Sequence, residues 1–290
     1  TVISSGYNSV TALTLNPASG VTATYNGIIA DGTGGMTLTK SGAGTQVLAG
    51  SNVLTGGTTI SAGTLSVGSI HDSGANNLGY GALTFNGGTL RYTGAGDTTS
   101  RLISFTGHSG IDVSAGAGML TIGSSISAAG YNLTKNGAGT LRFLNNGVTN
   151  RVLTINNGTV ILDGANFRYN VASAGNLMAG TPAAVLILTN NAVFTMPSQV
   201  LWMTGTDDTL VIDSGTLNVG QRLNVYSDMA RIVIRGGTAT FGTASASYVQ
   251  TGTWNQSGGS VSFANPVEFG AVATTVSGGT FTTTAYPLYL

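Results

Sequence analysis

The sequence predicts an all-β fold, a parallel β-helix built from stacked coils, and three observations support this prediction. First, Gly-Thr or Gly-Ser opens a short alternating apolar stretch many times along the chain, as in Gly44-Thr45 and Gly63-Thr64. Second, most copies lie about 19 to 25 residues apart, which is the period of structural units that bury an apolar face only by stacking. Third, no stretch of about 12 residues keeps a helical apolar pattern free of glycine, so we expect no helix.

A sandwich or barrel also suits short strands, but near-identical units favour the β-helix. If each unit is one coil, equivalent residues stack about 4.8 Å apart and the same turn recurs at the same place in every coil. We expect a single continuous domain over residues 1–290 with about 12 to 14 coils. The glycines that open the repeats are expected in turns, several with positive φ. They are Gly44, Gly63, Gly88, Gly139, Gly158, Gly215, Gly237, Gly259 and Gly279.

The apolar residues that follow these glycines define the expected core. Alternation along a strand sends every second side chain to the same face. We therefore expect stacked inward rows. Their members include Leu65, Leu90, Leu141, Val160 and Leu217. Two segments, 68–86 and 93–115, are longer than a coil requires, and we expect them to bulge outward as loops.

Composition limits the functions that remain open. Charged residues make up 7% of the chain and the formal net charge is zero, so there is no electrostatic footprint for nucleic acid or anionic lipid. The absence of cysteine excludes disulfides and thiolate metal sites. No apolar run of about 18 residues occurs, so we expect no transmembrane helix.

The longest internal match is Leu38-Thr39-Lys40-Ser41-Gly42-Ala43-Gly44-Thr45 against Leu133-Thr134-Lys135-Asn136-Gly137-Ala138-Gly139-Thr140. Both copies continue to a second Gly-Thr 19 residues after the first. This pattern resembles the autotransporter-associated β-strand repeat, also called the passenger-associated transport repeat, with good units at 38–68 and 133–164. The resemblance implies a right-handed parallel β-helix that is secreted or displayed on a bacterial cell surface. It implies nothing about a ligand.

Parallel β-helices also include polysaccharide-degrading enzymes, so an enzyme of this kind is a candidate function, although it is less favoured than the two non-enzymatic functions described below. Asp207-Asp208, Gly107-His108-Ser109-Gly110 and the segment 231–235 are faintly similar to motifs of pectin-degrading hydrolases. The histidine, however, precedes the aspartates here and follows them in that family. A solvated turn is the favoured interpretation of the aspartate pair. We expect no enzymatic activity, no catalytic residue and no cofactor.

His71 and His108 lie near Asp72 and Asp112, but a metal site needs three or four converging ligands. We expect both histidines to be exposed loop residues and no metal site. Six aromatic residues could form a row that stacks on sugars, although core packing is the favoured interpretation. They are Trp202, Trp254, Tyr80, Tyr92, Tyr226 and Tyr248.

Two non-enzymatic functions remain. Neither end of the chain shows a polar or helical cap, so we expect each end to be covered by another copy in a head-to-tail contact. This favours the subunit of an extracellular bacterial filament. The alternative is a monomeric adhesin or autotransporter passenger that binds host or matrix glycans through 68–86, 93–115 or an aromatic face. The candidate assembly residues are Val10, Leu13, Leu15, Phe281, Tyr286, Leu288 and Leu290.

Overall fold

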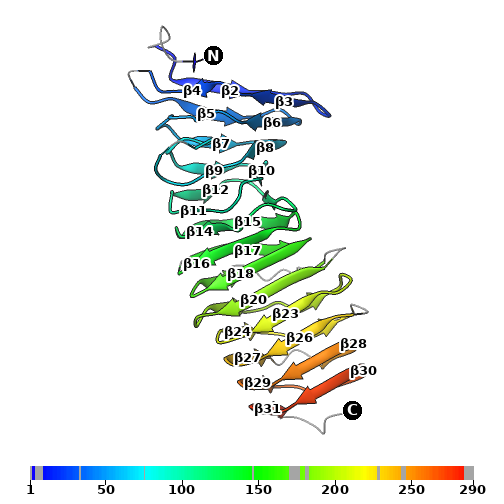
Figure 1. Cartoon of the computed structure of the whole chain (residues 1–290). Coiled ribbons are helices and arrows are strands. Elements are labelled where there is room, and N and C mark those ends of the chain that lie inside the picture. The colour runs from blue at the N-terminus through cyan, green and yellow to red at the C-terminus, as the bar shows by residue number, and fades with distance from the viewer. Residues whose placement is uncertain are drawn as a thin grey trace. The chain divides into compact units, whose positions relative to one another are not determined.

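The structure is a computed structural model, and it describes residues 2–3, 9–32, 34–74, 76–145, 147–169, 177–179, 183–226, 229–242 and 246–283. Within these residues the chain forms β-strands and no helix, as predicted. The chain divides into two units, Thr1–Leu141 and Arg142–Leu290, and each is described by itself. Within each unit, strands of successive coils lie side by side (Figure 1).

The first unit contains two long parallel ladders, in which each strand pairs with its counterpart one coil later. The first ladder comprises β2 (Ala12–Leu15), β5 (Thr37–Lys40), β7 (Thr58–Ile60), β9 (Leu83–Phe85), β12 (Ile103–Phe105) and the start of β15 (Ile126–Asn136). The second comprises β3 (Thr22–Tyr25), β6 (Thr45–Leu48), β8 (Thr64–Val67), β10 (Thr89–Tyr92), β13 (Ser109–Val113) and the end of β15. Shorter pairs join β1 (Val2–Ile3) to β4 (Ile28–Ile29) and β11 (Asp97–Thr99) to β14 (Leu120–Ile122).

The second unit contains three parallel ladders, and β16 (Thr140–Leu144) spans the boundary between the units. One ladder comprises β17 (Gly147–Ile155), β19 (Asn166–Tyr169), β21 (Val193–Met196), β24 (Thr216–Val219), β27 (Thr238–Phe241), β29 (Ser260–Phe263) and β31 (Thr280–Thr283). Another comprises β18 (Gly158–Asp163), β20 (Ala184–Thr189), β23 (Thr209–Ile212), β26 (Arg231–Ile234), β28 (Ser247–Gln256) and β30 (Val267–Val276). The third joins β22 (Leu201–Met203) and β25 (Leu223–Val225) to the first residues of β28 and β30.

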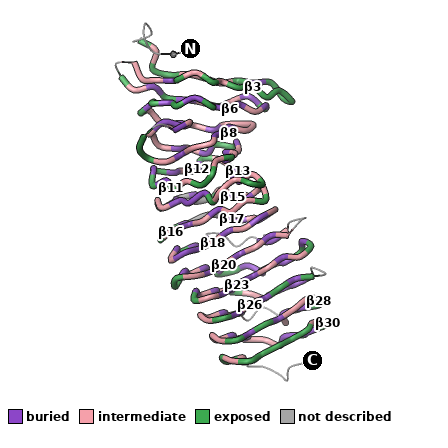
Figure 2. The backbone as a smooth tube through the Cα atoms, viewed as in Figure 1, coloured by how far each residue is buried: buried purple, intermediate pink, exposed green. Residues whose placement is uncertain are grey.

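The core of each unit lies inside the coils, where every second side chain of most strands is buried (Figure 2). The five residues predicted to point inward, Leu65, Leu90, Leu141, Val160 and Leu217, are each at most 1% exposed, which confirms that prediction. Leu65 and Leu90 pair in register, one coil apart. Aromatic residues stack in the same way: the paired Phe85 and Phe105 rings are 4.7 Å apart.

The chain forms a β-solenoid of about 11 turns, slightly fewer than the 12 to 14 expected. Coil length explains the difference, because it varies widely. Thr45 pairs with Thr64, 19 residues later, whereas Asn166 pairs with Val193, 27 residues later. The right-handedness of the coils and the single continuous domain stay predictions.

The two matching Leu-Thr-Lys segments do not occupy the same ladder. Leu38–Lys40 belongs to β5 and lies in the first ladder of its unit. Leu133 to Asn136, at the end of β15, instead pairs with Ser109 to Asp112 of β13, in the second ladder. The expectation that the same turn recurs at the same place in every coil is therefore wrong for these two copies. The long strand β15 causes the shift, because it crosses from the first ladder to the second without a Gly-rich turn.

Candidate functional site

A buried lysine closes the turn in each copy of the repeat. In the first copy, the Lys40 ammonium donates to the carbonyl of Gly42 in its own turn and to that of Ala62 in the next coil, the latter at 3.0 Å. In the second copy, Lys135 donates to the carbonyls of Asn136 at 2.8 Å and Gly137 at 2.7 Å. Both lysines are fully buried, so these carbonyls compensate the ammonium for the water it has lost.

Burial lowers the pKa of both lysines. For Lys135 it lowers the pKa to about 8, although the nearby Asp112 carboxylate opposes this shift. For Lys40 burial also lowers the pKa. Because each ammonium is bound to turn carbonyls inside the coil, its role here is to hold the turn, and it offers no accessible amine for chemistry.

The repeat glycines lie at the corners between ladders. Gly63 has a φ of 61°, and a Cβ added there would lie 2.3 Å from the Gly44 carbonyl oxygen in the coil before. Gly44 itself would place a Cβ 2.1 Å from the carbonyl oxygen of Ala18. Close contact between successive backbones therefore requires glycine. The predicted glycines with positive φ are Gly63, Gly158, Gly237, Gly259 and Gly279, and Gly158 is the first residue of a strand, β18. Gly44, Gly88, Gly139 and Gly215 lie next to the first residue of β6, β10, β16 and β24.

The aspartate pair does not form a solvated turn. Asp207 lies in the turn with a φ of 61°, but Asp208 is fully buried. Its carboxylate accepts hydrogen bonds from the backbone N–H groups of Gly205 at 2.8 Å and Ala184 at 3.1 Å. Burial raises the pKa of Asp208, although these hydrogen bonds oppose the shift. The expectation of a solvated turn is therefore wrong for Asp208, whose carboxylate is buried and holds the turn. The sequence pattern around an aspartate in a turn is the same whether its carboxylate is buried or solvated.

Segment 68–86 forms a loop followed by β9, and a buried arginine holds the loop in place. The guanidinium of Arg101 donates to the carbonyls of Ile70 at 2.7 Å and Gly79 at 3.0 Å. Asp97 accepts from the backbone N–H of Ile70 at 2.7 Å, so the loop is fixed from two sides. Segment 93–115 was expected to bulge outward, which is wrong: it contains β11, β12 and β13.

Both histidines belong to the polar surface of the first unit. His71 lies 3.7 Å from Asp97, and its side chain is 34% exposed. His108 is exposed and accepts a hydrogen bond from the backbone N–H of Asn132 at 2.9 Å. Among the described residues, no three side chains of His, Asp or Glu come together in a way that could hold a metal ion.

The aromatic residues divide between core and surface. Trp254 and Tyr92 are fully buried and cannot stack on a sugar. Trp202 and Tyr226 stack on each other with ring centroids 5.7 Å apart, and Tyr226 is 42% exposed. Trp202 pairs in register with Asn224, and Asn224 pairs with Tyr248 in the next coil. Trp202 and Tyr248 therefore lie on the same side of this ladder. Tyr80 is half-buried and donates to the Gly74 carbonyl at 2.7 Å.

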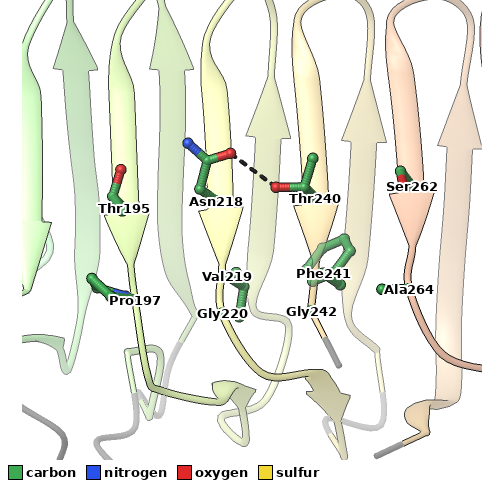
Figure 3. A pocket seen from close by; sticks show the side chains of 10 residues that line it. All are labelled: Thr195, Pro197, Asn218, Val219, Gly220, Thr240, Phe241, Gly242, Ser262 and Ala264. Atoms are coloured by element: carbon green, nitrogen blue, oxygen red, sulfur yellow. Dashed lines mark hydrogen bonds between the residues drawn. The ribbon is translucent and has the colours of Figure 1, made fainter. Parts of the chain in front are cut away.

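A shallow groove of about 350 Å³ crosses β21, β24, β27 and β29 of the second unit (Figure 3). Four polar side chains in register form one side, and the Thr240 hydroxyl donates to the Asn218 side-chain oxygen at 2.8 Å. Pro197, Gly220, Gly242 and Ala264 contribute to the other side, where Gly220 packs so closely on the preceding coil that a Cβ would lie 1.8 Å from the Pro197 carbonyl oxygen. None of the lining residues is charged. They are Thr195, Pro197, Asn218, Val219, Gly220, Thr240, Phe241, Gly242, Ser262 and Ala264.

The candidate assembly residues that the structure describes lie in or just before β2 and in β31. Val10, Leu13, Leu15 and Phe281 are all half-buried. Tyr286, Leu288 and Leu290 lie outside the described residues.

These features define a β-solenoid with tightly held turns. A family model, the passenger-associated-transport-repeat, matches the chain twice, at residues 38–67 and 133–162. The chain therefore contains two passenger-associated transport repeats, as the resemblance implied. Comparisons with curated proteins and with solved structures find no match. The described part of the chain contains no helix long and apolar enough to cross a membrane.

Proposed function

We propose that this chain is a non-enzymatic structural protein, secreted or displayed on a bacterial surface, whose outermost coils stack on those of other copies to form a filament. One observation carries this proposal. Among the described residues, apolar side chains of β2 and β31 are only half-buried, whereas their register partners in the adjacent coil are buried.

In the first unit, β2 and β3 belong to the first coil whose long strands the structure describes. Leu13 and Leu15 of β2 are half-buried, although they point to the same side as their partners in β5. Those partners, Leu38 and Lys40, are 1% and 0% exposed. The two leucines therefore leave apolar surface exposed to water. One further coil would cover this surface, and its burial would stabilise the contact by about 25 cal/mol per Å².

The second unit has the same contrast at β30 and β31. Phe281 is half-buried, whereas its partner Val261 is fully buried. Val276 is 49% exposed, and its partner Gln256 is 1% exposed. Apolar side chains that are exposed in this way could pack against the apolar side chains at the end of another copy.

The strand edges favour the same partner. Among the described residues, β2 pairs with β5 and β31 pairs with β29, each along one edge. Within the described part of the chain, no strand pairs with the other edge of β2, and another parallel strand at the same spacing would pair with that edge. A head-to-tail contact of this kind does not close, so it produces a filament. The zero net charge adds little long-range repulsion between copies.

The absence of enzymatic activity is part of the proposal. Several ionisable side chains of the kind that an active site would use instead hold turns or loops, as Asp208, Arg101 and both lysines do. We expect no turnover of acidic or neutral polysaccharides, with or without calcium. Activity that is lost on replacing Asp208 with asparagine would contradict this part.

Electron microscopy of the purified full chain tests the assembly. We expect filaments that lengthen with protein concentration, and we expect Leu13→Lys to shorten them because it places a charge on the coil surface. Leu102→Lys is the matched control, since Leu102 is 68% exposed and its variant should form filaments like the wild type. Single rods at high concentration, or equal shortening by both variants, would contradict the proposal.

A second function, a monomeric adhesin that binds glycans, is favoured by the stacked Trp202 and Tyr226 pair. Aromatic rings on a surface can stack on the apolar faces of sugars. If this function holds, Tyr226→Ala should abolish glycan binding and leave a chain that stays monomeric.

A further inference from the structure

A second hollow, of about 280 Å³, opens on the first unit above β10, β13 and β15. It differs from the groove of Figure 3 because most of its surface is polar. Its lining contains hydroxyl, amide and imidazole groups and no carboxylate, lysine or arginine. The lining residues are Gly87, Thr89, His108, Ser109, Gly110, Asn132, Thr134 and Asn136.

The hollow exists because Gly110 interrupts a row of threonines. Gly110 pairs with Thr89 in one neighbouring strand and with Thr134 in the other. Glycine in the interior of a strand weakens the strand, and it often marks a place where a ligand approaches the backbone. A threonine at this position would continue the row and suit the strand better.

Packing does not require this glycine. The φ of Gly110 lies outside the left-handed region, and an added Cβ would meet the ends of two side chains: Thr89 Oγ1 at 3.0 Å and Asn136 Nδ2 at 3.2 Å. The glycines of other strands are different. A Cβ on Gly252 or Gly270 would lie 2.1 or 2.5 Å from a backbone carbonyl oxygen. Gly110 therefore keeps a space open that a side chain could fill.

Several polar groups around the space are available to a ligand. His108 Nδ1 accepts from the Asn132 backbone N–H at 2.9 Å, so in the neutral ring Nε2 carries the proton and can donate. The Tyr131 ring stands edge-on to this imidazole, with centroids 5.8 Å apart, and limits its rotation. The side-chain oxygen of Asn132 is buried and has no hydrogen-bond partner, so it lacks a donor. Such an atom lowers stability unless something binds it.

We propose that this hollow binds one neutral pyranose residue of a glycan. Sugar hydroxyls both donate and accept, which suits a donor at His108, an acceptor at Asn132 and the hydroxyls of Thr89 and Thr134. Arg91, two residues after Thr89 in β10, is bound to Asp112 at 2.7 Å, and Lys135, between Thr134 and Asn136, is fully buried, so neither charge is directed at an anionic ligand. The site lies on the outward face of a ladder, so it does not depend on the filament proposal.

Saturation-transfer NMR with the full chain tests the site, using the methyl glycosides of glucose, galactose, mannose and N-acetylglucosamine as probes. We expect transfer from the wild type to at least one probe. Gly110→Thr should weaken binding at least about tenfold, because it fills the hollow, and should keep or raise the melting temperature. Ala49→Thr is the matched control, since it introduces the same side chain at an exposed position directly after β6, away from the hollow and from the assembly strands, and it should bind like the wild type.

No transfer to any of the four probes from the wild type would overturn the proposal. Equal binding by Gly110→Thr and the wild type would also overturn it, because the ligand would then lie elsewhere. His108→Ala gives a second measure: we expect it to weaken binding without changing the melting temperature, since His108 is exposed. Filament formation should be the same in all three variants, which separates this test from that of the assembly.

Discussion

The two copies of the passenger-associated transport repeat share their sequence and differ in their surroundings. Leu38–Lys40 of the first copy lies in the first ladder of its unit, whereas Leu133 to Lys135 of the second copy lies in the second ladder. Lys40 donates to a carbonyl of the next coil, at Ala62, and Lys135 donates to carbonyls of its own turn, at Asn136 and Gly137. The repeat therefore specifies a turn, and the length of the chain between turns decides which face of the solenoid the turn joins.

The physical reason lies in the range over which each interaction acts. A glycine conformation and a lysine bound to adjacent carbonyls depend on residues within one turn. The face is decided by pairing with a strand about 20 residues away, and coils here differ by up to eight residues in length. A turn sequence can consequently move to another corner without any change in its own structure.

The largest expected loss of stability comes from replacing the second Gly-Thr glycine of each copy, Gly63 or Gly158. Gly63 has a φ of 61° and Gly158 a φ of 71°, and we expect the same local turn in both copies. Valine at either position should lower the free energy of unfolding by on the order of 4 kcal/mol, because a β-branched residue is strained at positive φ, and at Gly63 the added Cβ would also meet backbone of the preceding coil. Urea unfolding measures the loss. Gly74→Val is the control for φ alone, since Gly74 has a φ of 78° and open space around it.

If the two valine variants lost clearly different amounts of unfolding free energy, the local structures of the turns at Gly63 and Gly158 would have to differ, which would contradict this prediction. A loss at Gly74 as large as that at Gly63 would show that strain at positive φ, and not contact with the preceding coil, accounts for the effect.

A smaller effect is expected on the pH dependence of stability, which should differ between variants of Lys135 and Lys40. Burial lowers the pKa of Lys135 to about 8 from an ordinary value of 10.5, so between these values the unfolded chain binds more protons than the folded chain. Stability should therefore rise with pH across this window, by at most about 3 kcal/mol from this group. Urea unfolding of Lys135→Met should lack that rise, and Lys40→Met should keep it.

Parallel pH profiles for the wild type and Lys135→Met would contradict this account. A wild-type stability that falls between pH 8 and pH 10.5 while that of Lys135→Met stays level would reverse its sign.

Much of the fold could be predicted from the sequence because its signals are local. The alternation after each Gly-Thr correctly placed Leu65, Leu90, Leu141, Val160 and Leu217 in the core. The absence of helices in the described residues was predicted from the same pattern. These features need no information about distant residues, so a single sequence is sufficient for them.

Other features depend on which strands become neighbours, and the sequence did not predict them. The segment 93–115 forms strands because Ile103 and Gly110 find partners one coil away. Asp208 is buried because backbone N–H groups of Ala184 and Gly205 converge on it, and Ala184 lies 24 residues earlier. The hollow at Gly110 was missed for the same reason, since its glycine becomes unusual only beside Thr89 and Thr134. A glycine inside a strand-forming stretch was the one available signal.

Disulfide trapping tests the shift between faces most directly, because the chain contains no cysteine of its own. Gly110 and Thr134 are register partners in adjacent parallel strands, which lie about 4.8 Å apart and so within reach of a disulfide. Cysteines at these two positions should cross-link on mild oxidation. If the second copy occupied the same ladder as the first, Thr134 would match Thr39 and lie beside Ser104. Efficient cross-linking of Ser104→Cys with Thr134→Cys, without cross-linking of the Gly110→Cys pair, would contradict the account.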